Sequence, residues 1–359
     1  MTDDAALYDA VVMLGFGGPE HPDDVLGFLE RVTAGRGIPP ERLAEVGRHY
    51  FIRGGTSPIN AQNRAMRDAL AERLAARGVG IDLVLANRNS PPFVADVLAD
   101  LARQGRTRLL AWATAAYSSY SSCRQYREDL GMAVEQLDGT HVDVVKMPPF
   151  PDLPGLVEAN IDLLAEVLRQ TSGSRELLVL ATTHSLPTAL AATAGPEAGR
   201  SGGDLYTAQQ RALVERVVPE AAARAGLAVV PEWRLVYQSR SGAPHVPWLE
   251  PDVNDAIGEA AGAGVTDVVI LPVGFLTDHV EVSWDLDTQA RQTAEGLGVT
   301  THRVPTVGAH PAFLDSLADL LAAYATNAGR APGPGELCRG DCCLNPRIQR
   351  PVADAVHLP

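Results

Sequence analysis

Short apolar segments recur along the chain and alternate with longer segments whose apolar residues follow a helical period. The short segments end in glycine, proline or small polar residues, which is typical of strands buried on both faces of a sheet. Eight of them lie at 10–14, 81–86, 109–114, 142–147, 177–181, 234–237, 268–273 and 301–304. Helical patterns lie at 61–77, 92–104, 156–169 and 311–325. Strands that alternate with helices predict βαβ units and parallel sheets.

Eight strands in two sets of four predict an α/β fold with two similar doubly wound domains, each a four-stranded parallel sheet flanked by helices. The halves also resemble each other, since 11–18 and 179–187 are both an apolar strand followed by a small or polar turn, which indicates a duplication. We expect domains over 1–150 and 151–310, and a C-terminal helix and Cys-containing tail over 311–359. Ligands of such folds bind beyond the carboxyl ends of the strands, where chemistry should be sought.

Charge and composition narrow the function classes. The 359 residues carry a formal net charge of -14, so nucleic acid is not an expected partner. No run of 18 or more apolar residues occurs, so no integral membrane segment is expected. Asp3 and Asp4 stand where a signal peptide would have a basic start, and we therefore expect a cytoplasmic protein.

His184 directly follows the predicted strand at 177–181. A neutral imidazole at that end of the sheet could ligate a metal ion or accept a proton. The alternative is a histidine that only forms hydrogen bonds at a strand end. A Ser–His hydrolase is disfavoured because the chain has no G-x-S-x-G motif.

A row of acidic residues follows the predicted strand at 268–273. If a helix begins near Asp278, then Asp278 caps it and shares one face with Glu281 and Asp285. Crowded carboxylates can hold a proton or bind a cation. The alternative is a solvated acidic first turn, which the helix dipole favours.

Three further segments suit a flat, anionic ligand. The glycines of 15–20 lack the third glycine of a dinucleotide-binding loop, but a planar molecule can lie against glycine backbone. In the segment 54–60, Ser57 or Thr56 can cap a helix whose free N–H groups also suit a carboxylate. The hydroxyls and aromatic rings of 117–126 suit a planar polar ligand.

The chain has four cysteines, namely Cys123, Cys338, Cys342 and Cys343. Their spacing does not match ordinary zinc motifs, whereas four thiolates are the number that a 2Fe–2S cluster requires. Clustered cysteines in a reducing compartment favour a metal site over disulfides. The alternative is a set of exposed thiols on a tail without structure.

Taken together, these motifs resemble those of the ferrochelatase family. They occur in the order FGGPE (16–20), GRG (35–37), GGTSPIN (54–60), NRNSPPF (87–93), YSSYSSC (117–123), THSLP (183–187) and GFLTDHVEV (274–282). The chain is most similar to actinobacterial members that look like coproporphyrin ferrochelatases. The resemblance implies two four-stranded sheets, a porphyrin cleft between the domains and a C-terminal helix that packs back on the first domain. It implies insertion of ferrous iron into coproporphyrin III, or into protoporphyrin IX, in haem biosynthesis.

The resemblance also implies roles for particular residues. His184 and Glu281 match the two residues that handle the substrate iron on opposite walls of the cleft, and Asp285 lies behind Glu281. The four cysteines look like the ligands of a 2Fe–2S cluster. Residues expected to contact the porphyrin are Ser57, Tyr126, Phe16, Tyr120 and Arg36.

Two positions depart from the pattern of the relatives. Phe16 stands where many have Tyr, and Gln289 stands where a carboxylate often continues the acidic row. Our hypothesis is that His184 accepts pyrrole protons while Glu281 and Asp285 handle iron or the departing protons. Two other classes stay open: a chelatase for another metal or tetrapyrrole, and a non-catalytic haem-binding or iron–sulfur redox-sensing protein.

Overall fold

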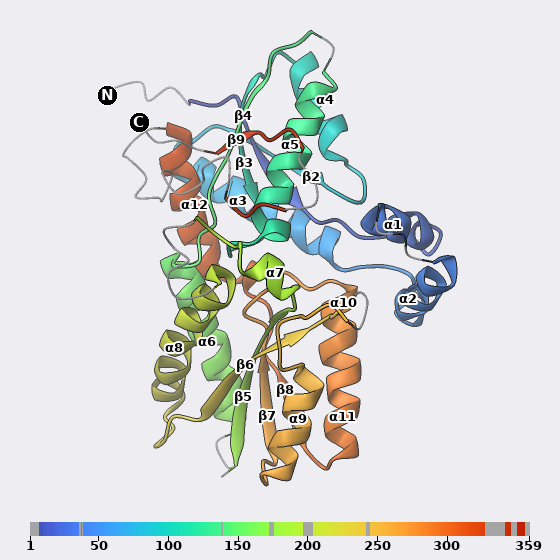
Figure 1. The fold of residues 1–359 in the computed structure, drawn as a ribbon. Coiled ribbons are helices and arrows are strands. Elements are labelled where there is room, and N and C mark those ends of the chain that lie inside the picture. The colour runs from blue at the N-terminus through green and yellow to red at the C-terminus, as the bar shows by residue number, and fades with distance from the viewer. Residues whose placement is uncertain are drawn as a thin grey trace.

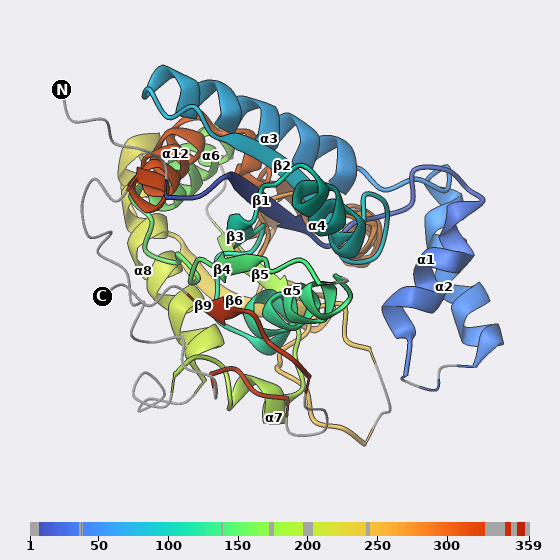
Figure 2. The ribbon, with the colours of Figure 1, turned by 90° about the horizontal axis from the view of Figure 1, so that it is seen from above.

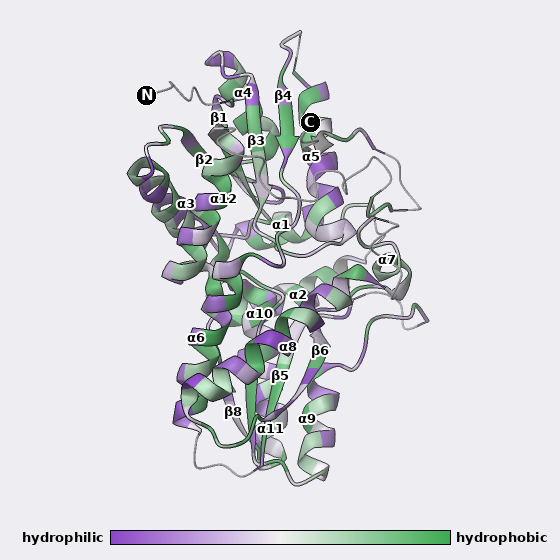
Figure 3. Cartoon of the chain, turned by 90° about the vertical axis from the view of Figure 1, so that its left-hand side faces the viewer, coloured by the Kyte–Doolittle hydropathy of each residue, from purple (hydrophilic) through white to green (hydrophobic). Residues whose placement is uncertain are grey.

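The computed structural model describes residues 7–35, 37, 39–137, 139–171, 176–196, 204–241, 245–326, 342–345 and 350–355. All eight predicted strands are present within these residues. They are β1 (Ala10–Gly15), β2 (Asp82–Asn87), β3 (Arg108–Ala113), β4 (Asp143–Lys146), β5 (Leu177–His184), β6 (Glu232–Gln238), β7 (Asp267–Leu271) and β8 (Thr300–Arg303). Figure 3 shows strands such as β3 and β4 as mostly apolar, as expected of strands covered on both faces, whereas β8 is polar and partly exposed.

The strands form two parallel sheets with the same connectivity. Their orders are β2-β1-β3-β4 and β6-β5-β7-β8, so the strand order reverses between β1 and β3 in one sheet and between β5 and β7 in the other. The predicted fold class is confirmed, with one addition: the two-residue strand β9 (Asp354–Ala355) pairs with β4 at the edge of the first sheet. In such sheets ligands bind where the strand order reverses.

Helices flank both sheets (Figure 1). In the first half they are α1 (Asp24–Thr33), α2 (Pro40–Ile52), α3 (Ile59–Ala76), α4 (Val94–Arg103) and α5 (Gln125–Glu135). In the second half and beyond they are α6 (Pro154–Gln170), α7 (Thr188–Ala191), α8 (Leu205–Ala225), α9 (Val253–Gly262), α10 (Val280–Trp284), α11 (Arg291–Gly296) and α12 (Pro311–Thr326). Two π-helical turns, η1 (Tyr120–Arg124) and η3 (Asp285–Ala290), and the 3-10 turn η4 (Val307–Ala309) complete the set.

Helix α12 joins the two halves. It lies along α3 and α6, and Phe313 and Leu317 are completely buried there. Its polar face is tied to α3 by ion pairs from Arg73 to Asp315 (2.8 Å) and from Arg77 to Asp319 (2.6 Å). The C-terminal helix therefore packs on an element of the first half, as the resemblance implies. The domain boundaries at 150 and 310 stay an interpretation.

Helices α1 and α2 form a hairpin that stands away from the first sheet (Figure 2). Its apolar side has a small core of its own, made by Val25, Phe28, Leu29 and Tyr50. Val280, the first residue of α10, belongs to the same core. The hairpin is thus attached to the second half of the molecule next to Glu281.

The described part of the tail contacts both halves. The Leu344 carbonyl accepts a hydrogen bond from Thr193 after α7, and Ala353 N–H donates to the Arg127 carbonyl on α5 (2.9 Å). A Cβ on Gly131 would lie 2.8 Å from the backbone of Pro351, so glycine permits this close approach. Among the described helices, none is long and apolar enough to cross a membrane.

Candidate functional site

His184 is the last residue of β5, at the point where the strand order of the second sheet reverses. Its Nδ1 lies 2.5 Å from the Ser185 carbonyl oxygen. Because a carbonyl only accepts, Nδ1 carries the proton and Nε2 keeps its lone pair. The side chain is 34% exposed, so Nε2 is accessible to a ligand.

Glu281 lies in the first turn of α10, and its Oε2 is 3.8 Å from His184 Nε2. The carboxylate is 44% exposed. Both residues belong to the second half, so the expectation that they face each other from opposite walls is not met. A flat ring between two side chains needs roughly 7 Å from atom to atom, which is twice an ordinary carbon contact. At 3.8 Å from each other, the two groups leave no room for such a ring between them.

Asp285 begins the π-helical turn η3, directly after α10. It accepts hydrogen bonds at Oδ2 from the Ser239 hydroxyl and, at 3.5 Å, from Gln238 Nε2. Burial is the main cause that raises the pKa of Asp285 to about 7; the Glu281 and Asp252 carboxylates act in the same direction, and the two hydrogen bonds oppose the shift. Asp285 can therefore exchange a proton near neutral pH.

Asp278 does not join this acidic row. The N-cap of α10 is His279, whose Nδ1 accepts a 3.5 Å hydrogen bond from Val282 N–H, so the helix starts later than the sequence suggests. Asp278 instead pairs with Arg303 at 2.7 Å. The row on the helix consists of Glu281 and Asp285, one turn apart.

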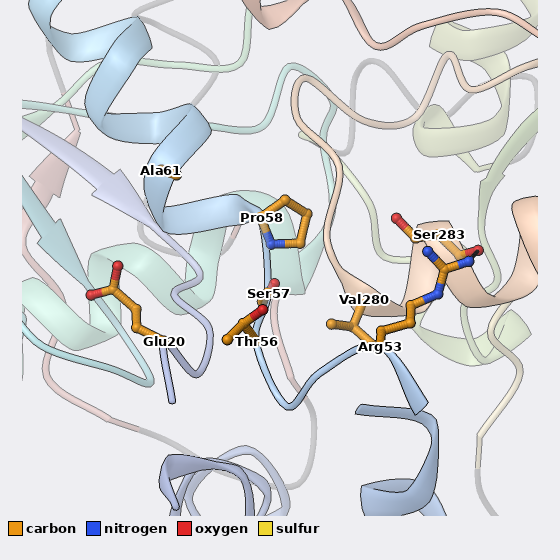
Figure 4. A pocket seen from close by; sticks show the side chains of 8 residues that line it. All are labelled: Glu20, Arg53, Thr56, Ser57, Pro58, Ala61, Val280 and Ser283. Carbon is orange, nitrogen blue, oxygen red and sulfur yellow. Dashed lines mark hydrogen bonds between the residues drawn. The ribbon is translucent and has the colours of Figure 1, made fainter. Parts of the chain in front are cut away.

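A cavity of about 400 Å³ lies beside this row, between the connection from α2 to α3 and helix α10 (Figure 4). Its lining residues are Glu20, Arg53, Thr56, Ser57, Pro58, Ala61, Val280 and Ser283. Ser57 was predicted to contact the porphyrin, and the structure places it in this lining with only 8% exposure. The predicted capping is absent, because no side chain caps α3 and the Ser57 N–H donates to the Pro19 carbonyl (2.8 Å).

Arg53, at the end of α2, connects the first-half lining of this cavity to α10 and the turn η3, which carry the acidic row. Its Nη2 donates to the Ser283 carbonyl (2.6 Å) and to the Thr288 hydroxyl (2.8 Å). Figure 4 shows the guanidinium beside Ser283. On the same side, the rings of His49 and Trp284 stack with centroids 4.1 Å apart. The end of α2 thereby holds α10 and the turn η3.

Three other predicted porphyrin contacts lie in different surroundings. Phe16 follows β1 and packs edge-on against Phe28 (6.2 Å) in the core of the α1–α2 hairpin. Tyr126 is 4% exposed beneath the Arg88 guanidinium, and the Tyr120 hydroxyl donates to Glu128 (2.9 Å). Arg36 lies outside the described residues. The roles of these residues stay predictions.

Two of the four cysteines come together. Cys342 and Cys343 are buried, and their Sγ atoms are 3.7 Å apart. Cys123 is also buried, with Lys146 Nζ 3.5 Å from its Sγ, while Cys338 lies outside the described residues. Within the described ranges no three His, Cys, Asp or Glu side chains are grouped to hold a metal ion. The complete four-thiolate set predicted for a 2Fe–2S cluster is therefore not assembled there.

Two residues of the site were not singled out from the sequence. Gln238 and Ser239 follow the apolar run at 234–237, so they are polar residues at the carboxyl end of a predicted strand. The same criterion that selected His184 would have selected them. Their contact with Asp285 could not be predicted, because it depends on a π-helical turn 46 residues further along the chain.

Comparison with known proteins shows the family to which this chain belongs. The family profile described as ferrochelatase matches residues 8–324. A coproporphyrin III ferrochelatase from Propionibacterium freudenreichii is 47% identical over 95% of this chain and 95% of its own. One from Streptomyces coelicolor is 43% identical over 99% of this chain and 98% of its own. Among solved structures, SirB from Bacillus subtilis with Fe3+ is 14% identical, with a TM-score of 0.47 over 89% of this chain and 97% of that one.

The sequence matches, which cover most of the chain, show that it is an enzyme that inserts a metal ion, a lyase. More particularly, the chain belongs to the ferrochelatase family, because the family profile covers most of its length.

Proposed function

We propose that this chain inserts ferrous iron into coproporphyrin III in haem biosynthesis, with His184 and Glu281 as the residues that handle iron and protons. The observation that carries the proposal is the 3.8 Å approach of His184 Nε2 to Glu281 Oε2, with both side chains partly exposed. Relatives that are 40–47% identical are named coproporphyrin III ferrochelatases, which supports this substrate.

The reaction exchanges one ferrous ion for two pyrrole protons, so charge is conserved and no electron is transferred. The lone pair of His184 Nε2 is free to accept the first proton, because the other ring nitrogen is held by the Ser185 carbonyl. Glu281 lies beside it, and Asp285, with a pKa of about 7, is suited to pass a proton to solvent. The cations of iron and imidazolium would both be stabilised by this acidic pair.

Replacement of His184 and Glu281 tests the assignment. His184→Ala and Glu281→Gln should lower kcat for iron insertion by roughly 100-fold or more, which is typical of a lost acid–base group. Porphyrin binding, measured by fluorescence quenching, should persist. His302→Ala is a matched control, because His302 also pairs with a carboxylate, Asp267 (2.8 Å), but at the edge strand β8. Near-normal turnover of His184→Ala would reject the assignment.

A side-by-side assay separates the alternatives. One enzyme preparation should be assayed with coproporphyrin III and with protoporphyrin IX, each with ferrous iron and with cobalt, and the values of kcat/KM compared. We expect ferrous iron with coproporphyrin III to give the highest kcat/KM. A preference for another metal would favour a different chelatase, and tight haem binding without insertion would favour a non-catalytic protein.

We further propose that the cavity beside α10 receives a carboxylate substituent of the porphyrin. Support comes from Arg53 and Ser57 in its lining and from the adjacent start of α3, since free N–H groups at a helix start favour anions. Arg53→Ala should raise KM for coproporphyrin III more than Arg53→Lys does. An unchanged KM in both variants would reject this assignment.

The finer proposal of a 2Fe–2S cluster held by Cys123, Cys338, Cys342 and Cys343 rests on one spacing. Two thiolates on a tetrahedral metal with bonds of about 2.3 Å are about 3.8 Å apart. The Cys342 and Cys343 Sγ atoms are 3.7 Å apart, and Gly195 N–H donates to Cys343 Sγ (3.0 Å). When bound, such a cluster supplies one-electron redox chemistry, and hydrogen bonds to its sulfurs tune its potential.

Protein made anaerobically with abundant iron tests the cluster. It should be brown and contain iron and labile sulfide, and Cys342→Ser should lose both. Leu344→Ala, at an exposed neighbouring residue, should keep them. Colourless, folded wild-type protein would reject the cluster.

A further inference from the structure

Ser239 has an unusual backbone conformation for its residue type. It directly follows β6 and has a φ of 61°, which places a non-glycine residue in the left-handed region. A side chain makes that region unfavourable, so residues held there are fixed by their surroundings and occur often at functional sites. The contact that fixes Ser239 is therefore informative.

That contact is to the acidic row. The Ser239 hydroxyl donates to Asp285 Oδ2, and Gln238 Nε2 donates to the same oxygen at 3.5 Å. A carboxylate can only accept, so both groups act as donors whenever Asp285 is ionised. The other charged groups that act on Asp285 are Glu281, on the same stretch of helix, and Asp252, before α9.

Of these two donors, Gln238 also contacts the strand that carries His184. Gln238 is the register partner of His184 in the parallel pair of β5 and β6. Its carbonyl accepts a hydrogen bond from Ser185 N–H (2.8 Å), and its side chain is 1% exposed. The end of β6 is thus a fixed point between His184 on one side and Asp285 on the other.

We propose that Ser239 is a positioning residue for iron insertion: its left-handed backbone aims the hydroxyl at Asp285 and holds that carboxyl in line behind Glu281. The inference rests on the proposed function, and it assigns to Ser239 no contact with substrate. Loss of the hydroxyl leaves Asp285 free to turn away and weakens the passage of protons from the Glu281 side.

Ser239→Gly separates this role from a purely structural one. Glycine adopts the left-handed conformation without strain, so the variant removes the hydroxyl and should keep the fold. The expected result is a kcat lower by about tenfold or more, the usual effect of losing a hydrogen bond to a charged group, with KM for porphyrin unchanged. Ser241→Gly, two residues further on at an exposed position, is the matched control and should behave as the wild type.

A second measurement does not depend on activity. The infrared band of the Asp285 carboxyl, identified by its loss in Asp285→Asn, should titrate at higher pH in Ser239→Gly than in the wild type, because the hydroxyl favours the ionised form. An unchanged titration, or an unchanged kcat in a folded Ser239→Gly variant, overturns the proposal. An inactive wild type would instead reject the proposed function, and the infrared titration would still decide the role of Ser239.

Discussion

Asp285 shows how one side chain is set by its surroundings at the residue scale. It lies at the start of the turn η3, where burial and the Glu281 carboxylate disfavour its charge while Ser239 and Gln238 favour it. The balance places its pKa at about 7, whereas an ordinary aspartate titrates near 3.8. A carboxyl tuned this way holds its proton in the folded chain under conditions where the unfolded chain releases it.

This difference predicts a pH dependence of stability. Between about pH 4 and pH 7 the folded chain binds more protons at Asp285 than the unfolded chain, so the free energy of unfolding falls as pH rises. Each unit of pKa difference corresponds to about 1.4 kcal/mol. Asp285→Asn removes this contribution, so the variant should gain stability relative to the wild type between pH 5 and pH 8, measured by urea unfolding.

Asp285→Glu is the control for that measurement. It keeps an ionisable group at the same position and should keep a fall in stability with pH. If the free energies of unfolding of wild type and Asp285→Asn differed by the same amount at pH 5 and at pH 8, the environment assigned to Asp285 would be contradicted.

At the scale of elements, the connection from α2 to α3 depends on two successive glycines. Gly54 and Gly55 both have positive φ, at 83° and 73°. A Cβ on Gly54 would meet no atom within 4 Å, whereas a Cβ on Gly55 would lie 2.6 Å from Pro22 Cα. Gly55 thus sets how closely the cavity wall at Ser57 approaches the segment before α1.

The two glycines therefore form a matched pair of variants. Gly54→Ala should cost about 1–2 kcal/mol, the price of left-handed backbone alone. Gly55→Ala should cost more, because the backbone at Pro22 must also move, and should raise KM for the porphyrin. Chemical denaturation and steady-state assays check both. Equal losses in the two variants would contradict the role of the Pro22 contact.

Elements were also what the sequence predicted most reliably. The apolar runs marked eight of the nine strands that the structure describes, because strands covered on both faces must be apolar. The strand β9 was missed, since two residues carry no pattern. The turn at Asp285–Ala290 and the later start of α10 were missed as well, because tertiary contacts such as those of Arg53 decide local helix geometry.

The sequence predicted which residues form the candidate site but not how they are arranged in space. His184, Glu281 and Asp285 stand out because they are polar groups after buried strands. Their arrangement on one side follows from strand order, in which β7, before α10, pairs directly with β5. Tyr126 is an aromatic residue of the kind that can contact a porphyrin, but the Arg88 guanidinium covers its ring. No local sequence pattern predicts that pairing.

At the scale of the whole molecule, the tail links distant parts of the chain. Cys342–Asn345 lie by the loop after α7, and Arg350–Ala355 pack on α5 and β4. The three atoms nearest to a Cβ on Gly131 would all be backbone atoms of Pro351 and Val352, each 2.8 Å away. The docking of residues 350–355 on α5 therefore depends on one glycine, Gly131.

Gly131→Ala should release the tail without unfolding the sheets. The expected result is faster proteolysis after α12, detected by mass spectrometry, and faster modification of Cys342 and Cys343 by a thiol reagent. Gly258→Ala in α9 is the control, because a Cβ there meets no atom within 4 Å, and it should raise stability by about 0.5–1 kcal/mol. A tail that stays protected in Gly131→Ala would contradict this prediction.

His184 and Glu281 both belong to the second half, and this has a consequence for how iron and protons would reach and leave a porphyrin. Under the proposed function both groups would lie on one side of the ring plane, so the arriving cation and the departing protons would follow the same route. Each pyrrole nitrogen that loses its proton gains a negative charge, which would attract the metal cation. Loss of protons and entry of the cation would therefore favour each other electrostatically. Under the same proposal, the opposite surface of the ring would be left to residues of the first half.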